Sequence, residues 1–190
     1  MRIIAGTKRG MKLHSPMTQV SRPITDRVKE SLFSVLHKYD LPSGKKVADL
    51  FCGVGSLGLE ALSRGAVSVT FVEQDQQVSV VLKKNIEKAG FAGESKIIRA
   101  DAFKIGAPVD EWEYDLIFVD PPYVCTEDVG QGSPLSGLLE VLSEQVSDDG
   151  IVVVRINRRT ELLGKYGRFG IVERRKWGNM AVTILKKTSK

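Results

Sequence analysis

The chain has 190 residues, of which 42% are hydrophobic, and its formal net charge is +5. This length and composition suit a single domain with a full core, and they exclude a mainly disordered chain. No apolar run approaches the roughly 20 residues needed to span a bilayer, and the first residues lack the long apolar segment of a secretory signal.

The first 40 residues are predicted to form a basic extension, and residues 41–190 the main domain. The stretch "RIIAGTKRGMKL" alternates loosely around two glycines, as the short strands of a hairpin do. Apolar side chains then recur at helical spacing over residues 24–39. Thr25 can cap this predicted helix, and Asp26 suits its positive N-terminal end. The residues "LPSGKK" end it.

From residue 46 onward, strand and helix patterns alternate. Strands are expected at 46–51, 67–73, 95–101, 114–120 and 150–156. Helices are expected at 56–65, 75–90 and 133–147. Residues 170–187 form two further strands around Gly178-Asn179, with no helix between them. The order predicts an α/β fold, a doubly wound, mostly parallel, Rossmann-like sheet with an antiparallel C-terminal hairpin. Ligands bind such sheets at the carboxyl ends of the strands.

Four of the expected strands have an acidic residue at or near their carboxyl end. These are Asp49, Glu73, Asp101 and Asp120. Because the carboxyl ends of parallel strands meet at one edge of a sheet, we expect several of these carboxylates at one binding crevice.

A glycine-rich turn follows the first of these acids. Gly53, Gly55 and Gly58 satisfy the G-x-G-x-x-G pattern, and Glu73 lies 20 residues after the first glycine. This spacing also occurs in dinucleotide-binding folds, and the glycines could simply make a tight turn. Asp49, however, would place negative charge near a pyrophosphate. A cationic ligand without phosphate, such as S-adenosylmethionine, suits the acids better: Glu73 would bind its ribose.

The fourth strand leads into "DPPY", residues 120–123. The exocyclic amine of a nucleobase is a poor nucleophile because its lone pair is delocalised into the ring. Hydrogen bonds from that amine to the Asp120 carboxylate and the Pro121 carbonyl would localise the lone pair, and the prolines restrict the backbone that presents these acceptors. Tyr123 can stack on an extruded base. The tetrapeptide therefore predicts direct methyl transfer without a metal or a covalent nucleophile.

Charge is unevenly distributed along the chain. Residues 1–46 hold 10 Lys and Arg against 3 Asp and Glu, residues 155–190 hold 11 against 2, and the residues between them hold 7 against 18. Basic ends that only aid solubility would give the same counts. The more specific interpretation is that both basic ends bind one polyanion and leave the acidic centre for another task.

With these motifs in this order, the chain resembles the class I S-adenosylmethionine-dependent amino-methyltransferases, and specifically the bacterial 16S ribosomal RNA guanine-N2 methyltransferases of the RsmD type. The resemblance rests on "RIIAGTKRGMKL", "RPITDRVKESLF", "DLFCGVGSLGLEALSRGA", "FVEQD", "RADAF", "DPPY" and "RRKWGNMAVTIL". It implies a seven-stranded sheet and transfer of a methyl group to the N2 amine of a guanine of the guanine-966 type. It also implies a cytoplasmic monomer that acts on 16S rRNA within a partly assembled small subunit, away from membranes.

The resemblance carries over residue by residue. The cofactor-binding positions are Thr25, Arg27, Asp49, Phe51, Gly53, Gly55, Glu73, Gln74, Asp101, Ala102 and Asp120. The catalytic positions are Asp120, Pro121, Pro122 and Tyr123. The RNA-binding positions are Arg2, Lys8, Arg9, Lys12, Arg22, Arg174, Arg175, Lys176 and Trp177. The chain departs from the family pattern at Cys52, at Gln74 and at Arg155, which stands where many members have Glu after the fifth strand.

Three alternatives stay open at this point. N6-adenine and N4-cytosine DNA methyltransferases share the tetrapeptide, although this chain has little room for a DNA-recognition domain. A dehydrogenase would use the same glycine loop for NAD. An RNA-binding assembly factor without catalytic activity would have the same basic ends. The two cysteines, Cys52 and Cys125, stand outside any metal-ligand spacing, which suits a soluble protein of the reducing cytoplasm.

Overall fold

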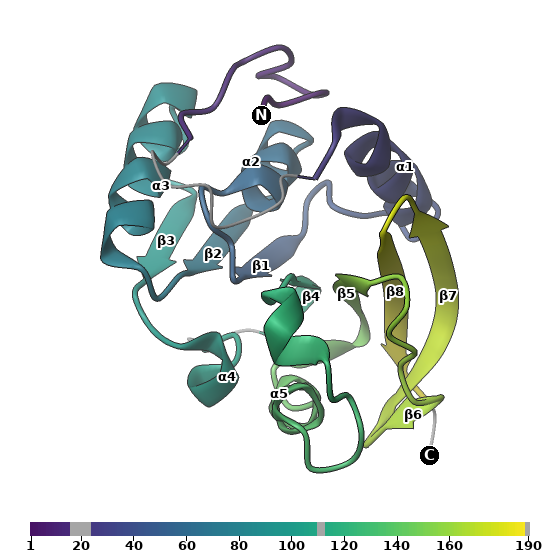
Figure 1. Cartoon of the computed structure of the whole chain (residues 1–190). Coiled ribbons are helices and arrows are strands. Elements are labelled where there is room, and N and C mark those ends of the chain that lie inside the picture. The colour runs from purple at the N-terminus through teal and green to yellow at the C-terminus, as the bar shows by residue number, and fades with distance from the viewer. Residues whose placement is uncertain (16–23, 110–112, 189–190) are drawn as a thin grey trace.

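The structure, a computed structural model, describes residues 1–15, 24–109 and 113–188. Its centre is a sheet of eight strands in the order β3-β2-β1-β4-β5-β8-β7-β6 (Figure 1). The strands are β1 (Lys46–Leu50), β2 (Ser68–Val72), β3 (Ser95–Ile98), β4 (Tyr114–Val119), β5 (Val146–Asn157), β6 (Lys165–Tyr166), β7 (Phe169–Trp177) and β8 (Met180–Lys187). Strands β1 to β5 pair in parallel, and β8 pairs with β5 and β7 antiparallel. The predicted fold class is confirmed.

The expected strand count of seven is wrong. The eighth strand is β6, whose two residues pair antiparallel with the start of β7 at the edge of the sheet. Two residues are too few to show the alternation of apolar and polar side chains from which strands are predicted. This short edge strand lies far in sequence from the residues assigned to the active site.

Helices cover both faces of the sheet, α1 (Asp26–His37), α2 (Ser56–Ser63) and α3 (Gln76–Ala89) on one side, α4 (Ala102–Ile105) and α5 (Pro134–Leu142) on the other (Figure 1). Thr25 caps α1 as predicted, since its hydroxyl accepts from the backbone N–H of Val28. Gly90 ends α3 in the left-handed conformation that glycine favours. The short α4 and the 3-10 turn η1 (Tyr123–Thr126) had not been predicted. Over residues 1–15, 24–109 and 113–188, no helix could cross a membrane.

Two hydrophobic cores lie on the two faces of the sheet, because successive residues of a strand point to opposite sides. In β1, Val47 packs into the core under α1, α2 and α3, whereas Ala48 and Leu50 pack into the core under α4 and α5. The same alternation separates Phe118 from Val119 in β4. Strands buried on both faces give the near-continuous apolar runs seen in the sequence.

The N-terminal segment forms a hairpin-like loop in which one antiparallel bridge, Arg2 to Lys12, replaces the two expected strands. The backbone N–H of Ile3 donates to the Met11 carbonyl at 2.9 Å. The loop is held on α2 by side chains of that helix: the Glu60 carboxylate accepts from the backbone N–H groups of Ile4 and Ala5 at 2.8 and 3.0 Å. The predicted division at residue 40 is crossed by these contacts and stays a prediction.

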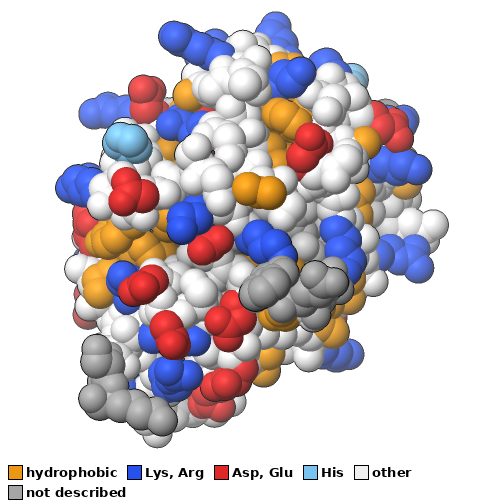
Figure 2. Space-filling model, turned by 180° about the vertical axis from the view of Figure 1, so that it is seen from behind, with side chains coloured by type: hydrophobic (Ala, Val, Ile, Leu, Met, Phe, Trp, Pro, Cys, Tyr) orange, Lys and Arg blue, Asp and Glu red, His pale blue; other side chains and the backbone are white. Residues whose placement is uncertain are grey.

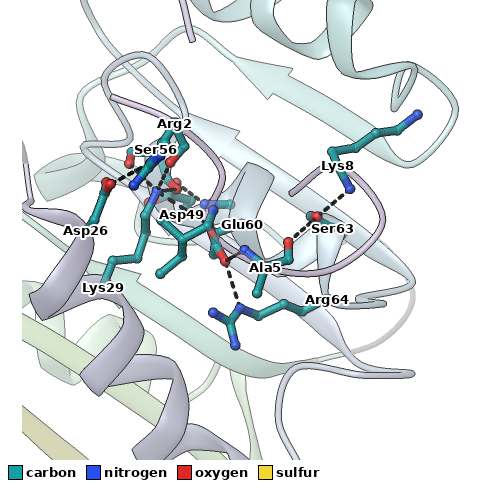
Figure 3. A network of polar contacts seen from close by, with 12 residues as sticks. Arg2, Ala5, Lys8, Asp26, Lys29, Asp49, Ser56, Glu60, Ser63 and Arg64 are labelled. Carbon is teal, nitrogen blue, oxygen red and sulfur yellow. Dashed lines mark hydrogen bonds and ion pairs between the residues drawn. The ribbon is translucent and has the colours of Figure 1, made fainter. Parts of the chain in front are cut away.

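A buried ion pair ties this loop to both α1 and α2 (Figure 3). Lys29 Nζ lies 3.4 Å from a Glu60 carboxylate oxygen, and both side chains are at most 1% exposed. The same ammonium donates to the Arg2 carbonyl at 2.7 Å and to the Ser56 hydroxyl at 3.2 Å. Arg64 completes the network by donating to Glu60 at 2.8 Å. The basic extension is therefore fixed against the helix that follows the glycine loop.

Candidate active site

Three of the predicted acids come together at the carboxyl edge of the sheet. The parallel register pairs Leu50 with both Val72 and Val119, so Asp49, Glu73 and Asp120 lie at the ends of three adjacent strands. Burial raises the pKa of Asp49 well above the usual range of a carboxyl group, and the negative charges of Asp120 and Glu73 add to this effect. The clustering expected from the sequence is thus present in three dimensions.

The turn between β1 and α2 places its backbone in the left-handed region at three positions. Phe51, Gly53 and Gly55 have φ angles of 57°, 54° and 85°. A Cβ atom at Gly55 would lie 2.6 Å from the side chain of Leu82, so this glycine permits close packing of α2 on α3. Among the residues that the structure describes, a Cβ atom at Gly53 would meet nothing within 4 Å. These residues therefore leave space for a ligand at the Gly53 backbone.

Asp49 supports this turn from beneath. Its side chain is buried, and its carboxylate accepts from the backbone N–H of Gly58 at 2.8 Å. That N–H belongs to the first turn of α2, where backbone donors have no partner inside the helix. A carboxylate there also suits the positive end of the helix.

Glu73 connects the turn to the end of β2. One carboxylate oxygen accepts from the backbone N–H of Gly53 at 3.0 Å, and the other accepts from the backbone N–H of Asp75 at 2.8 Å. Each carboxylate oxygen can accept two hydrogen bonds, so both retain capacity for ligand hydroxyl groups. Gln74 is exposed beside it.

Asp101 caps the short helix α4. Its carboxylate accepts from the backbone N–H of Phe103 at 3.0 Å, and Ala102 is buried. The ring of Phe103 packs on Phe51, with centroids 4.7 Å apart and planes tilted by 58°. Sequence reasoning missed Phe103, because the ring on which it packs is 52 positions away in the chain. Whether Asp101 also contacts an adenine stays a prediction.

The tetrapeptide leaves β4 at the same edge. Asp120 directly follows the strand, Pro121 is buried, and Tyr123 begins the 3-10 turn η1. The Pro122 carbonyl accepts from the backbone N–H of Cys125 at 2.9 Å, and the Thr126 hydroxyl donates to the Tyr123 carbonyl at 3.0 Å. These bonds fix the turn, while Tyr123 remains partly exposed.

Arg155 is the partner of the Asp120 carboxylate. Its Nε lies 2.5 Å from Asp120 Oδ1, and the two side chains are 11% and 18% exposed. The departure from the family pattern at Arg155 therefore lies inside the candidate site. The sequence did not reveal this pair, because it follows from the register of β4 on β5: Asp120 and Arg155 each come one position after paired strand residues, Val119 and Val154.

Thr25 and Arg27 lie at the start of α1. Thr25 acts as the helix cap, and Arg27 is exposed in the first turn. Their expected role at the methionine end of a donor or at the target base stays a prediction.

The predicted RNA-binding residues of the N-terminal segment lie on the loop that is fixed to α2. Arg2 pairs with Asp26 at 2.6 Å, Lys8 lies over the ring of Phe91, and Arg9 and Lys12 are exposed. Arg22 lies outside the described residues. Figure 2 shows Lys and Arg side chains across one face of the molecule, with Asp and Glu side chains among them.

The C-terminal basic residues lie on β7, near the active-site edge. Arg155 on β5 pairs with Val182 on β8, which pairs with Arg175 on β7, so these residues lie in one row across three strands. Arg174 donates to the Thr160 carbonyl at 2.6 Å, and Lys176 lies 3.7 Å from Glu161. Trp177 is half-buried and packs against the core beneath α1. The row of strands brings this basic segment toward Asp120, and its contact with RNA stays a prediction.

Comparison with known proteins gives one family and several close relatives. The family described as "Conserved hypothetical protein 95" matches residues 1–186. The Bacillus subtilis protein YlbH is 33% identical over 98% of this chain and 99% of its own length. The Escherichia coli K12 protein named ribosomal RNA small subunit methyltransferase D is 36% identical over 79% of this chain and 68% of its own length. The solved structure of Escherichia coli yhhF superposes with a TM-score of 0.82 at 30% identity, covering 100% of this chain and 99% of that one.

Proposed function

Since the chain belongs to the conserved hypothetical protein 95 family, the RsmD-type family of class I methyltransferases, we propose that it transfers a methyl group from S-adenosylmethionine to the N2 amine of a guanine in 16S rRNA. Methylation of rRNA agrees with the name of the Escherichia coli relative. The observation that carries the finer proposal is the position of Asp120, which follows β4 at the same sheet edge as the glycine turn and Glu73.

The residues of the crevice fit such a donor. The open backbone at Gly53 leaves space where a side chain would otherwise stand. Asp49, Glu73 and Asp120 supply negative charge, which suits an ammonium and a sulfonium and disfavours a pyrophosphate. When bound, S-adenosylmethionine supplies an electrophilic methyl group on its sulfonium sulfur. Glu73 would hold the ribose hydroxyls, and Phe51 with Ala102 would border the adenine.

Asp120 and Pro121 provide the hydrogen-bond acceptors for the target amine. A guanine N2 amine that donates to the Asp120 carboxylate and the Pro121 carbonyl is held with its lone pair directed away from both acceptors. Orientation of this kind lowers the entropic cost of the reaction. Positive charge develops on the nitrogen as the new bond forms, and the adjacent carboxylate stabilises it. Tyr123 would stack on the extruded base.

RNA is the favoured class of substrate because the candidate catalytic edge adjoins a basic strand segment, and the name of the Escherichia coli relative points to the small subunit. Arg175 lies in the same row as Arg155, and the N-terminal basic loop is anchored on α2 next to the glycine turn. Positive side chains on two sides of a crevice are suited to phosphates that flank an extruded nucleotide. A partly assembled subunit, rather than naked RNA, is part of the same proposal.

The proposal is tested by mass spectrometry of 16S rRNA nucleosides from cells with and without the gene. We expect N2-methylguanosine to decrease by one residue per 16S molecule in the deletion strain and to return with the intact gene, but not with Asp120→Ala. A parallel assay with the purified protein and labelled S-adenosylmethionine compares small subunits from the deletion strain with genomic DNA. Label in DNA as N6-methyladenine or N4-methylcytosine, with an unchanged rRNA profile, would reject the proposal.

A further inference from the structure

We propose that Arg155 is a positioning residue that keeps the Asp120 carboxylate ionised and oriented toward the target amine. The interaction itself follows from the geometry alone. Its consequence for catalysis rests on the proposed function. The relevant contact is the ion pair between Arg155 Nε and Asp120 Oδ1 at 2.5 Å.

The fold fixes this pair through strand register. Val119 on β4 pairs with Val154 on β5, and Asp120 and Arg155 each follow by one residue. Arg155 itself still lies within β5 and pairs with Val182 on β8, so its backbone is held from the side opposite β4. The two side chains are mostly buried, and the ion pair is therefore less screened than one at the surface.

Titratable groups lie near this pair on several elements. Asp49 on β1 interacts with both members, Glu73 at the end of β2 lies beyond Asp49, and Tyr123 on η1 lies near Arg155. Arg155, on β5, carries the positive charge among these groups. Burial raises the pKa of Asp120, and the attraction and hydrogen bond of Arg155 oppose that effect. Without the guanidinium, burial would raise this pKa further and favour the protonated acid.

The protonation state decides what Asp120 can do. An ionised carboxylate accepts hydrogen bonds through both oxygens, whereas a carboxylic acid also donates one. The N–H groups of a target amine need an acceptor, so the ionised form is the useful one. With Arg155 bound to Oδ1, the second oxygen can accept from the amine in a fixed direction. A partner cation also makes Asp120 a weaker base, which suits an acceptor that orients the amine and stabilises its charge.

Substitutions at Arg155 separate the charge from the packing. Arg155→Met removes both charge and hydrogen bond, Arg155→Gln keeps an amide donor without charge, and Arg155→Lys keeps the charge without the planar fork. Arg168→Met is the matched control: Arg168 pairs with Asp148 at 3.4 Å, near the opposite end of β5. Arg155→Gln also provides a neutral variant if Arg155→Met does not fold.

The first measurement needs neither donor nor RNA. The titration of the Asp120 carboxyl carbon is followed by NMR in the full-length protein, and its signal is assigned as the one missing from Asp120→Asn. We expect the midpoint to move to higher pH in Arg155→Met and Arg155→Gln, and to stay near the wild-type midpoint in Arg155→Lys and Arg168→Met. An unchanged midpoint in the neutral variants overturns the inference, whatever the substrate is.

The second measurement is the pH profile of methyl transfer to small subunits from the deletion strain. Because the ionised fraction of an acid falls tenfold for each pH unit below its pKa, we expect the neutral variants to lose progressively more rate relative to wild type as the pH is lowered. We expect the difference to narrow as the pH is raised and Arg155→Lys to recover much of the rate. A loss that is equal at all pH values overturns the inference. If the wild-type protein transfers no methyl group to the subunits, the proposed function fails, while the NMR result still decides the role of Arg155.

Discussion

The Asp49 carboxylate accepts the backbone N–H of Gly58 at 2.8 Å and so joins the end of β1 to the first turn of α2. This contact lies directly beneath the glycine turn that we assign to the donor. We therefore expect substitutions at the two residues to act differently, at Asp49 through charge and at Gly58 through packing.

Asp49→Asn should separate stability from binding. Burial raises the pKa of Asp49 in the folded protein, so the folded state binds more protons than the unfolded state between the two pKa values. Stability therefore falls as pH rises through that window, and an ionised Asp49 destabilises the donor-free protein at neutral pH. The asparagine keeps an acceptor for Gly58 and removes the charge. We expect Asp49→Asn to be at least as stable as wild type at pH 7 in urea titrations.

The same variant should bind the donor more weakly. A charge–charge attraction is worth about 1–4 kcal/mol at contact distance, so the affinity for S-adenosylmethionine should fall about tenfold or more. Calorimetry in two buffers of different ionisation enthalpy should also show proton release on binding to wild type, because a cation favours the ionised acid. Equal affinity in the two proteins would remove Asp49 from the site.

Gly58→Ala should destabilise the protein. A Cβ atom at Gly58 would lie 2.3 Å from the ring of Phe71, inside the core beneath α2. Overpacking of this kind costs about 1–3 kcal/mol. Gly137→Ala is the matched control, because Gly137 lies in α5 and a Cβ there meets no atom of the described part of the chain within 4 Å. It should stabilise the protein by roughly 0.5–1 kcal/mol. Chemical denaturation checks that the two variants change the free energy of unfolding in opposite directions. A stabilised Gly58→Ala would contradict the packing of Gly58 on Phe71.

Asp120→Ala should abolish methyl transfer and leave donor binding nearly intact. A loss of 100-fold or more, on the order of what a positioned polar group contributes, is expected in single-turnover assays. Because this variant leaves Arg155 without its carboxylate partner, Asp120→Asn is tested beside it to control for folding. Activity equal to wild type in Asp120→Ala would refute the role given to this residue.

Lys29→Met should lower stability by about 3–5 kcal/mol, since it removes one member of a buried ion pair and leaves Glu60 partly uncompensated. The change should also loosen the N-terminal loop, because Lys29 donates to the Arg2 carbonyl. Lys83→Met, which removes an exposed pair with Glu87, should change stability by less than about 1 kcal/mol. Urea midpoints and amide exchange at residues 3–5 measure the two effects. Similar midpoints for both variants would show that the buried network contributes little.

Replacement of Arg174 and Arg175 by Gln should weaken binding of small-subunit RNA. The slope of log affinity against log salt should decrease by about one for each lost phosphate contact. Because Arg174 also donates to the Thr160 carbonyl, a thermal melt of the same variant is the control for folding. An unchanged salt slope in a folded variant would count against this surface.

Much of the fold could be predicted from the sequence because its signals are local. The helix caps at Thr25 and Ser133, the stop at Gly90 and the turn at Gly178-Asn179 depend on neighbouring residues. The alternation of strands and helices then restricts the topology to a doubly wound sheet. The two-residue β6 and the short α4 were missed because they are too short to show a period.

The candidate site, like the fold, could be predicted only in part from the sequence. That Asp49, Glu73 and Asp120 share one edge follows from the sequence, since parallel strands have their carboxyl ends together. Which partner each carboxylate has, Gly58, Gly53 or Arg155, does not follow, because each partner is 9, 20 or 35 positions away. Those pairings depend on strand register and on the angle at which each helix packs. The sequence therefore determined the sheet and the edge to which we assign the chemistry. Only the tertiary structure decided that an arginine neutralises the acid at its centre, because contacts between distant residues form only when the strands are aligned.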